Sequence, residues 1–80
     1  QMKLRINIIL KPTILDPQGQ AVASSLVGQG FENVKNVRQG KIFDIEFNSS
    51  KIDKKKINKM CEEFLSNPLI EDYSLEKLKE

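Results

Sequence analysis

The sequence contains no histidine and a single cysteine, Cys61, among its 80 residues. The lack of histidine excludes a Ser-His-Asp triad, a Cys-His dyad and any metal site that depends on histidine. One cysteine cannot form an internal disulfide or a CxxC motif, a usage that fits a reducing cytosol. Apolar runs reach only three residues, as from Ile8 to Leu10, which is far too short for a membrane span. The start Met2-Lys3-Leu4-Arg5 has no apolar signal-peptide core, so we expect a cytoplasmic protein without a membrane partner.

The length predicts one domain that spans residues 1–80. Hydrophobic residues make up 39% of the chain and charged residues 30%, values typical of a soluble globular domain. The net charge of +2 is too small to indicate a nucleic-acid partner. A chain of this length buries only about 60–65% of its unfolded surface, so we expect a partner protein to add stability.

Apolar residues that alternate with polar ones predict strands over about residues 4–10 and 42–47. A last strand is predicted from residue 70 to 78, although its charged end could fray. Val34 and Val37 suggest a further strand, but their spacing of three requires a bulge or a late start.

Two segments show helix signals. Asp16-Pro17 predicts a helix start, because Asp16 can cap free N–H groups and proline suits the first helical position. Gly30 is the expected left-handed residue at the end of this helix. The second helix is predicted to begin near Ser50, whose spacing from Asp53 resembles a capping box, and to end at Asn67-Pro68. Its expected buried stripe is formed by Ile57, Met60, Cys61, Phe64 and Leu65.

The predicted order is strand, helix, strand, strand, helix, strand. This order indicates the α+β class, as a two-layer, βαββαβ-like sandwich with a mainly antiparallel sheet and two helices on one face. Phe43, Ile45 and Phe47 must face the helices, because the opposite arrangement would bury Asp44 and Glu46. The open face then carries Arg5, Asn7, Ile9, Ile42, Asp44 and Glu46.

This open face argues against nucleic-acid binding, because it has no aromatic side chain on which a base could stack and has acids where phosphate would lie. Its mixture of apolar residues and both charge signs suits a protein partner instead. Ile9 and Ile42 would be exposed in a lone chain, so we expect at least a homodimer.

No group of residues in the sequence forms a catalytic centre. The adjacent acids Glu62-Glu63 and Glu71-Asp72 point apart on a helix or strand and cannot share a proton. Cys61 has no histidine to activate it and lies in the predicted buried stripe. The lysines between residues 51 and 59 are expected to form a solvated face. We therefore expect no catalytic, cofactor or metal site in this chain.

Several short motifs, which follow one another over essentially the whole chain, resemble the PurS family. They are Lys11-Pro12, Leu15-Asp16-Pro17-Gln18-Gly19, Gly30-Phe31, Val37-Arg38-Gln39-Gly40-Lys41, Met60-Cys61 and Asn67-Pro68-Leu69-Ile70-Glu71-Asp72-Tyr73. That family is the small subunit of phosphoribosylformylglycinamidine (FGAM) synthase, a glutamine-dependent ligase of purine biosynthesis.

The resemblance implies a non-catalytic subunit that bridges a PurL-type synthetase, which uses ATP and magnesium, and a PurQ-type glutaminase, and that supports ammonia transfer between them. We expect Gln18, Arg38 and Lys41 to serve docking rather than folding, with Arg38 and Lys41 solvated beside a glycine turn. The full set of interface candidates is Asp16, Gln18, Gly19, Arg38, Lys41, Asn67, Glu71, Asp72 and Tyr73. The alternative function is a small dimeric, ligand-sensing regulatory domain, and a stand-alone enzyme is less favoured.

Overall fold

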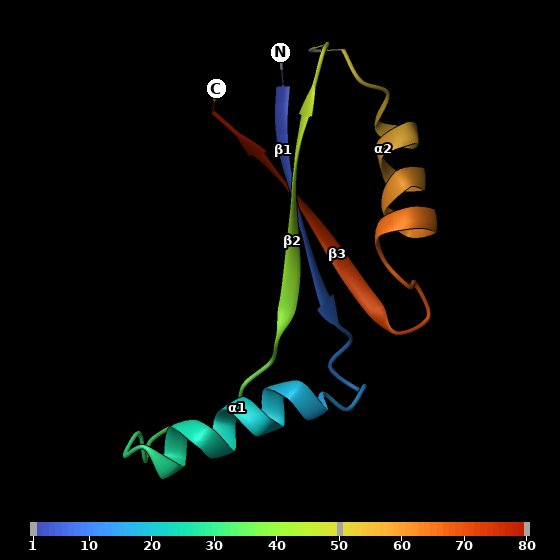
Figure 1. Cartoon of the computed structure of the whole chain (residues 1–80). Helices are drawn as coiled ribbons and strands as arrows, with labels where there is room; N and C mark the ends of the chain where they lie inside the picture. Colours follow the sequence, from blue (N-terminus) through green and yellow to red (C-terminus); the bar gives the residue numbers. More distant parts are fainter. Residues whose placement is uncertain (1, 50, 80) are drawn as a thin grey trace.

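The computed structural model describes residues 2–49 and 51–79. It contains a three-stranded sheet, two helices and one turn of π-helix (Figure 1). The elements in chain order are β1 (Met2–Leu10), α1 (Pro17–Gly28), β2 (Gly40–Phe47), α2 (Lys54–Met60), η1 (Cys61–Leu65) and β3 (Glu71–Leu78). The sheet order is β2-β1-β3 and both pairings are antiparallel, so the α+β class is confirmed.

Strand β1 is the centre of the sheet, and the register fixes which residues share a face. Met2 pairs with Phe47 at one end of β1 and Ile9 pairs with Gly40 at the other. This register places Arg5 opposite Asp44 on the open face, where Arg5 Nε donates to Asp44 Oδ1 over 2.8 Å. The ion pair raises the pKa of Arg5 and lowers that of Asp44. The predicted orientation of β2, with Phe43, Ile45 and Phe47 packed against the core, is confirmed.

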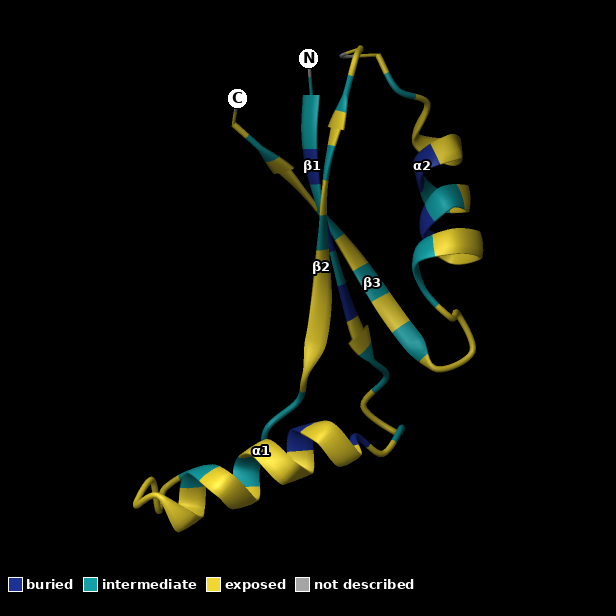
Figure 2. Ribbon diagram, viewed as in Figure 1, coloured by how far each residue is buried: buried dark blue, intermediate teal, exposed yellow. Residues whose placement is uncertain are grey.

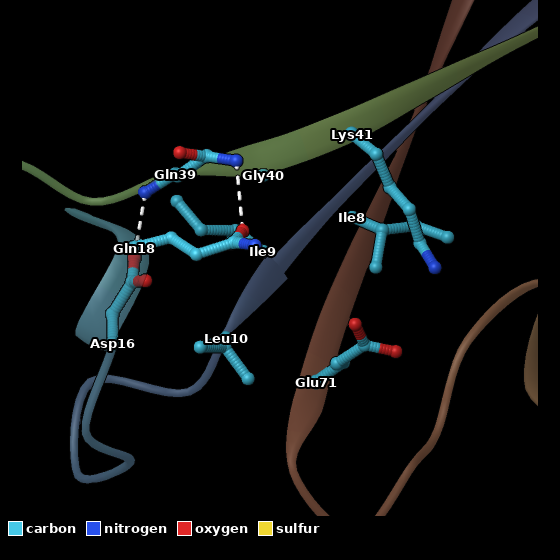
Figure 3. A pocket seen from close by; sticks show the side chains of 9 residues that line it. All are labelled: Ile8, Ile9, Leu10, Asp16, Gln18, Gln39, Gly40, Lys41 and Glu71. Carbon is cyan, nitrogen blue, oxygen red and sulfur yellow. Dashed lines mark hydrogen bonds between the residues drawn. The ribbon is translucent and has the colours of Figure 1, made fainter. Parts of the chain in front are cut away.

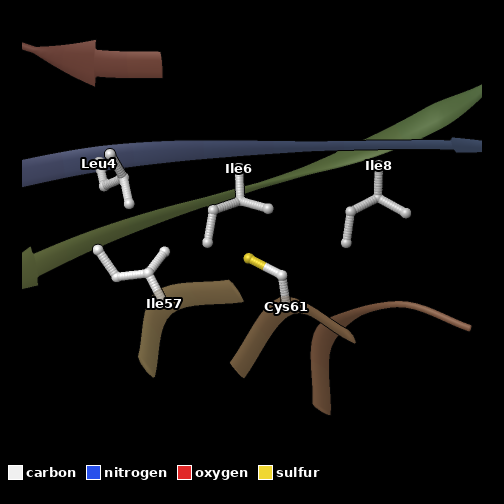
Figure 4. Close-up of a cluster of buried hydrophobic side chains, with 5 residues drawn as sticks. All are labelled: Leu4, Ile6, Ile8, Ile57 and Cys61. Atoms are coloured by element: carbon white, nitrogen blue, oxygen red, sulfur yellow. The ribbon is translucent and has the colours of Figure 1, made fainter. Parts of the chain in front are cut away.

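The core is small and lies between β1 and the second helix. The buried side chains Leu4, Ile6 and Ile8 of β1 point toward Ile57 and Cys61 (Figure 4). Cys61 is completely buried, and burial raises the pKa of its thiol. The prediction that Cys61 is a core residue is therefore confirmed.

The second helix departs from the predicted pattern at its end. Asp53 caps α2 by accepting a hydrogen bond from the Lys55 N–H, while Ser50 lies outside the described residues. After Met60 the chain forms the π turn η1, closed by a hydrogen bond from the Ser66 N–H to the Cys61 carbonyl. A π turn holds more residues than an α turn, so Phe64 rotates away from the sheet and is 80% exposed. Its predicted place in the buried stripe is wrong.

Helix α1 begins and ends as the sequence predicts. The Asp16 carboxylate accepts a hydrogen bond from the Gly19 N–H over 2.9 Å, and Pro17 is the first helical residue. At the other end Gly30 has a φ of 101°, and the Phe31 N–H donates to the Leu26 carbonyl. This pairing closes the helix by the expected left-handed turn.

The position of α1 differs from the predicted arrangement, in which both helices cover one face. Figure 1 shows α1 beyond the end of the sheet, whereas α2 lies beside it. The additional strand predicted around Val34 and Val37 is absent, because residues 34–39 pair with no strand and β2 starts at Gly40. Within this segment the Gln39 N–H donates to the Asp16 side chain instead, as described below. In the described part of the chain, no helix is long and apolar enough to cross a membrane.

Candidate interaction site at the base of helix α1

Three motifs that are distant in sequence meet at one end of the sheet. The start of α1 follows β1, Arg38 and Gln39 lead into β2, and β3 begins at Glu71, which pairs with Leu10 of β1. We call this region the junction and define it as residues Asp16, Gln18, Gly19, Arg38, Gln39, Lys41, Glu71 and Asp72. It unites most of the interface candidates that the sequence predicts.

Asp16 connects helix α1 to the segment that precedes β2. Besides its capping bond to Gly19, its Oδ2 accepts a hydrogen bond from the Gln39 N–H over 2.7 Å (Figure 3). The Gln39 bond and then the Gly19 bond lower the pKa of the Asp16 carboxyl, because both stabilise its charged form. Since both carboxylate oxygens are occupied, Asp16 is a structural anion rather than an acid or base for catalysis.

Gly19 allows a close approach between α1 and the segment that returns from it. A Cβ atom at this position would lie 2.3 Å from the Val37 carbonyl oxygen and 2.7 Å from Asp16 Oδ2. No side chain fits at such distances without a backbone shift. Glycine is therefore required here by packing. The sequence alone identified Gly19 only as part of a motif and did not predict this contact.

Arg38 holds the end of β1. Its guanidinium donates to the carbonyl oxygens of Leu10 and Lys11, over 3.3 and 2.8 Å. The prediction that Arg38 remains solvated is wrong, because its partly buried guanidinium satisfies two backbone carbonyl oxygens at the end of the strand. Arg38 thus contributes to folding, whatever else it contacts.

The start of β3 is fixed to the same end of the sheet. Lys11 Nζ lies 3.0 Å from Asp72 Oδ1, and the Lys11 N–H donates to the Ile70 carbonyl over 2.8 Å. Glu71 accepts a hydrogen bond from the Asn67 N–H over 2.7 Å, which closes the turn before the strand. The remaining candidate, Tyr73, donates to Asn58 on α2 over 3.3 Å and so belongs to the helix–sheet contact.

An open cleft of about 270 Å³ lies at the junction (Figure 3). Its polar lining comes from Asp16, Gln18, Gln39, Lys41 and Glu71, and Ile8, Ile9, Leu10 and Gly40 complete it. The Gln18 and Gln39 side chains are hydrogen-bonded to each other over 2.9 Å, and both residues are exposed. Gln39 is a site residue that sequence reasoning missed, because nothing in its spacing distinguished it from its neighbours in the motif.

The chemistry of this cleft suits recognition rather than catalysis. It offers a lysine, an aspartate, a glutamate and two amides, but no nucleophile beside a general base. Within residues 2–49 and 51–79, no three histidine, cysteine or acidic side chains gather closely enough to hold a metal ion. Exposed side chains with both hydrogen-bond donors and acceptors, on a rigid backbone, are what a protein docking surface presents.

Comparison with known proteins agrees with this reading. The family model named PurS, phosphoribosylformylglycinamidine (FGAM) synthase, matches residues 3–79. The FGAM synthase subunit PurS of Archaeoglobus fulgidus is 40% identical over 72 residues, which cover 88% of this chain and 90% of the relative. PurS of Bacillus subtilis superposes with a TM-score of 0.87 at 36% identity, covering 99% of this chain and all of that one.

A structure of PurLQS from Thermotoga maritima includes a chain of similar fold. The TM-score is 0.81 at 30% identity, and the match covers 96% of each chain. The family match extends over nearly the whole sequence and includes every residue of the junction. The chain therefore belongs to the PurS family of FGAM synthase.

Proposed function

We propose that this chain is the small, non-catalytic subunit of FGAM synthase in de novo purine biosynthesis. The observation that carries the proposal is the family match over residues 3–79, supported by relatives of similar length. This match favours a synthase subunit over a ligand-sensing regulatory domain.

The subunit acts in a complex with a PurL-type synthetase and a PurQ-type glutaminase. The complex converts formylglycinamide ribonucleotide, ATP and glutamine to formylglycinamidine ribonucleotide, ADP, phosphate and glutamate. ATP and magnesium are used by the synthetase, and ammonia released by the glutaminase reaches it while this chain bridges the two. A cytoplasmic location fits this role. The PurLQS assembly of Thermotoga maritima supports the same set of partners for this chain.

The exposed side chains of the junction are the proposed docking surface for the synthetase. Gln18 and Lys41 are exposed, whereas Asp16, Gly19 and Arg38 hold the backbone that presents them. Asn67, Glu71 and Asp72 extend the surface along the start of β3. In the first two motifs folding and docking are therefore assigned to different residues, whereas Asn67, Glu71 and Asp72 also fix the start of β3.

The double variant Gln18→Ala, Lys41→Ala tests this division. We expect it to keep the wild-type melting temperature within a few degrees, because both side chains are exposed. Its affinity for the tagged synthetase and glutaminase, titrated in the presence of glutamine and Mg-ADP, should fall about 3- to 30-fold. A variant with Asn48→Ala and Lys56→Ala, which changes exposed residues elsewhere, serves as the matched control. Equal affinities for the two variants would place the docking surface elsewhere.

A further inference from the structure

Among the large hydrophobic residues that the structure describes, Leu69 and Phe64 are the most exposed, at 83% and 80%. Leu69 lies in the turn between η1 and β3, which Figure 2 shows in the colour of exposed residues, and Phe64 lies five residues before it. Five residues of chain span at most about 18 Å, so both side chains fit within one protein–protein contact. A side chain that keeps four-fifths of its surface free projects from the molecule instead of lining a groove.

The π turn η1 turns Phe64 outward. The Ser66 N–H and the Ser66 hydroxyl both donate to the Cys61 carbonyl oxygen, over 2.9 and 2.8 Å, so this wide turn is closed by two hydrogen bonds. A regular α-helix would keep Phe64 on the apolar stripe that the sequence predicts. The π turn therefore moves a large apolar side chain from the core to the surface, and such turns are frequent at functional sites.

The turn that carries Leu69 is held by Asn67. The Asn67 carbonyl oxygen accepts from the N–H groups of Ile70 and Glu71, over 3.1 and 2.7 Å. The Asn67 side-chain oxygen accepts from the Leu69 N–H over 3.1 Å, and the Asn67 N–H donates to the Glu71 carboxylate over 2.7 Å. A turn fixed in this way loses little conformational entropy when it binds, so its exposed leucine is preorganised for a contact.

The charges beside this apolar pair are of one sign. From residue 60 to 76 the sequence has five acidic residues and no lysine or arginine, although the whole chain has a net charge of +2. Glu62 and Glu63, which directly precede Phe64, are exposed. An apolar centre with an acidic rim is complementary to an apolar pocket with a basic rim. A second copy of this chain would bring acid against acid, so a different protein fits better.

We propose that Phe64 and Leu69 are the anchors of a second docking surface, which fits an apolar pocket with a basic rim on the glutaminase. The surface shares no residue with the junction and consists of Glu62, Glu63, Phe64, Pro68 and Leu69. The proposal rests on the proposed function, in which this chain bridges two subunits and the junction binds the synthetase. The junction carries two exposed glutamines and Lys41, so the two surfaces differ in chemistry and select different partners.

The double variant Phe64→Ala, Leu69→Ala tests this surface. Labelled glutaminase is titrated with an equimolar mixture of the chain and the synthetase, in the presence of glutamine and Mg-ADP. We expect the affinity for the glutaminase to fall about 30-fold or more, as it does when central anchors are truncated. Both side chains are exposed, so the melting temperature should stay within a few degrees of the wild-type value. Should the double variant not fold, Leu69→Ala decides, with an expected fall of about 5- to 10-fold.

The matched control is Leu15→Ala, Phe31→Ala, which removes the same two side-chain types from exposed positions outside the surface. It should bind the glutaminase as the wild type does. Equal affinities of the Phe64/Leu69 variant and the wild type overturn the proposal, and so does an equal loss in the control. A loss of affinity for the synthetase instead of the glutaminase overturns it as well. A lower sedimented mass of the Phe64/Leu69 variant alone would assign the surface to a second copy and would also overturn it.

Glu62→Gln with Glu63→Gln tests the acidic rim, because it removes two charges and keeps the shape of the side chains. The association rate with the glutaminase at low salt should fall about 3- to 10-fold and should depend less on salt. An unchanged rate and salt dependence would contradict the basic rim of the pocket.

Failure of this proposal is distinguishable from failure of the proposed function. If the proposed function fails, the wild-type chain binds neither subunit and adds no turnover. If only the docking surface is wrong, the wild type and the Phe64/Leu69 variant bind the glutaminase and stimulate turnover equally.

Discussion

Replacing Ile6 by alanine is expected to lower the free energy of unfolding by about 2 to 5 kcal/mol, the usual cost of truncating a fully buried isoleucine. Ile6 has no exposed surface and lies at the centre of β1, between the other two strands and above α2. The core has few other members, since within residues 2–49 and 51–79 only Leu4, Ile8, Ile57 and Cys61 are hydrophobic residues buried with it. A cavity at this position therefore removes a large part of the stability of an 80-residue chain.

Urea unfolding followed by circular dichroism measures this effect. Ile42→Ala is the matched control, because Ile42 is the same residue type on the neighbouring strand but is 56% exposed. We expect it to change the free energy of unfolding by about 0.5 kcal/mol or less when the oligomeric state is held constant. Similar effects of the two substitutions would contradict the assignment of the core to the α2 side of the sheet.

Replacing Gly19 by alanine is expected to destabilise the protein, although alanine in a helix normally stabilises it by about 1 kcal/mol relative to glycine. The added Cβ would lie 2.3 Å from the Val37 carbonyl oxygen, which is backbone and cannot rotate away. Relief requires α1 to separate from the returning segment, which weakens the Asp16 hydrogen bonds to Gly19 and Gln39. We expect a net cost of about 1 to 3 kcal/mol.

Gly28→Ala in the same helix is expected to change the stability in the opposite direction. No atom lies within 4 Å of a Cβ built at Gly28, so alanine there should stabilise the protein by about 0.4 to 1 kcal/mol. The difference in melting temperature between the two variants therefore measures the contact at the junction and not helix propensity. If both substitutions stabilise the protein, α1 is not held as the structure shows.

Much of the local structure could be predicted from the sequence, because it depends on neighbouring residues. Strand alternation determined which side chains of β2 face the core, and Asp16 and Gly30 marked the two ends of α1. The Phe64 prediction failed because a π turn interrupts the helical period, and no residue type signals such a turn. Sequence periodicity predicts whether a segment is a helix or a strand more reliably than it predicts which side chains of the last turn face the core.

The arrangement in space was less predictable. The order of the elements predicted both helices on one face of the sheet, whereas the structure places α1 beyond the end of the sheet. The convergence of Asp16, Arg38 and Glu71 at one end of the sheet follows from the pairing of β1 with both other strands. The motifs that contain these residues were evident in the sequence. Only the hydrogen bonds of Arg38 and Asp16 in the structure show which motif residues hold the fold together and which remain exposed.

The central claim is that this chain is the small subunit of FGAM synthase, and reconstituted turnover tests it most directly. The synthetase and glutaminase subunits from the same source are assayed for FGAM formation with formylglycinamide ribonucleotide, ATP, magnesium and glutamine, with and without this chain. We predict that the chain alone has no activity and that its addition in stoichiometric amounts restores or strongly increases glutamine-dependent FGAM formation. Full glutamine-dependent activity of the two other subunits, unchanged when this chain is added, would contradict the account.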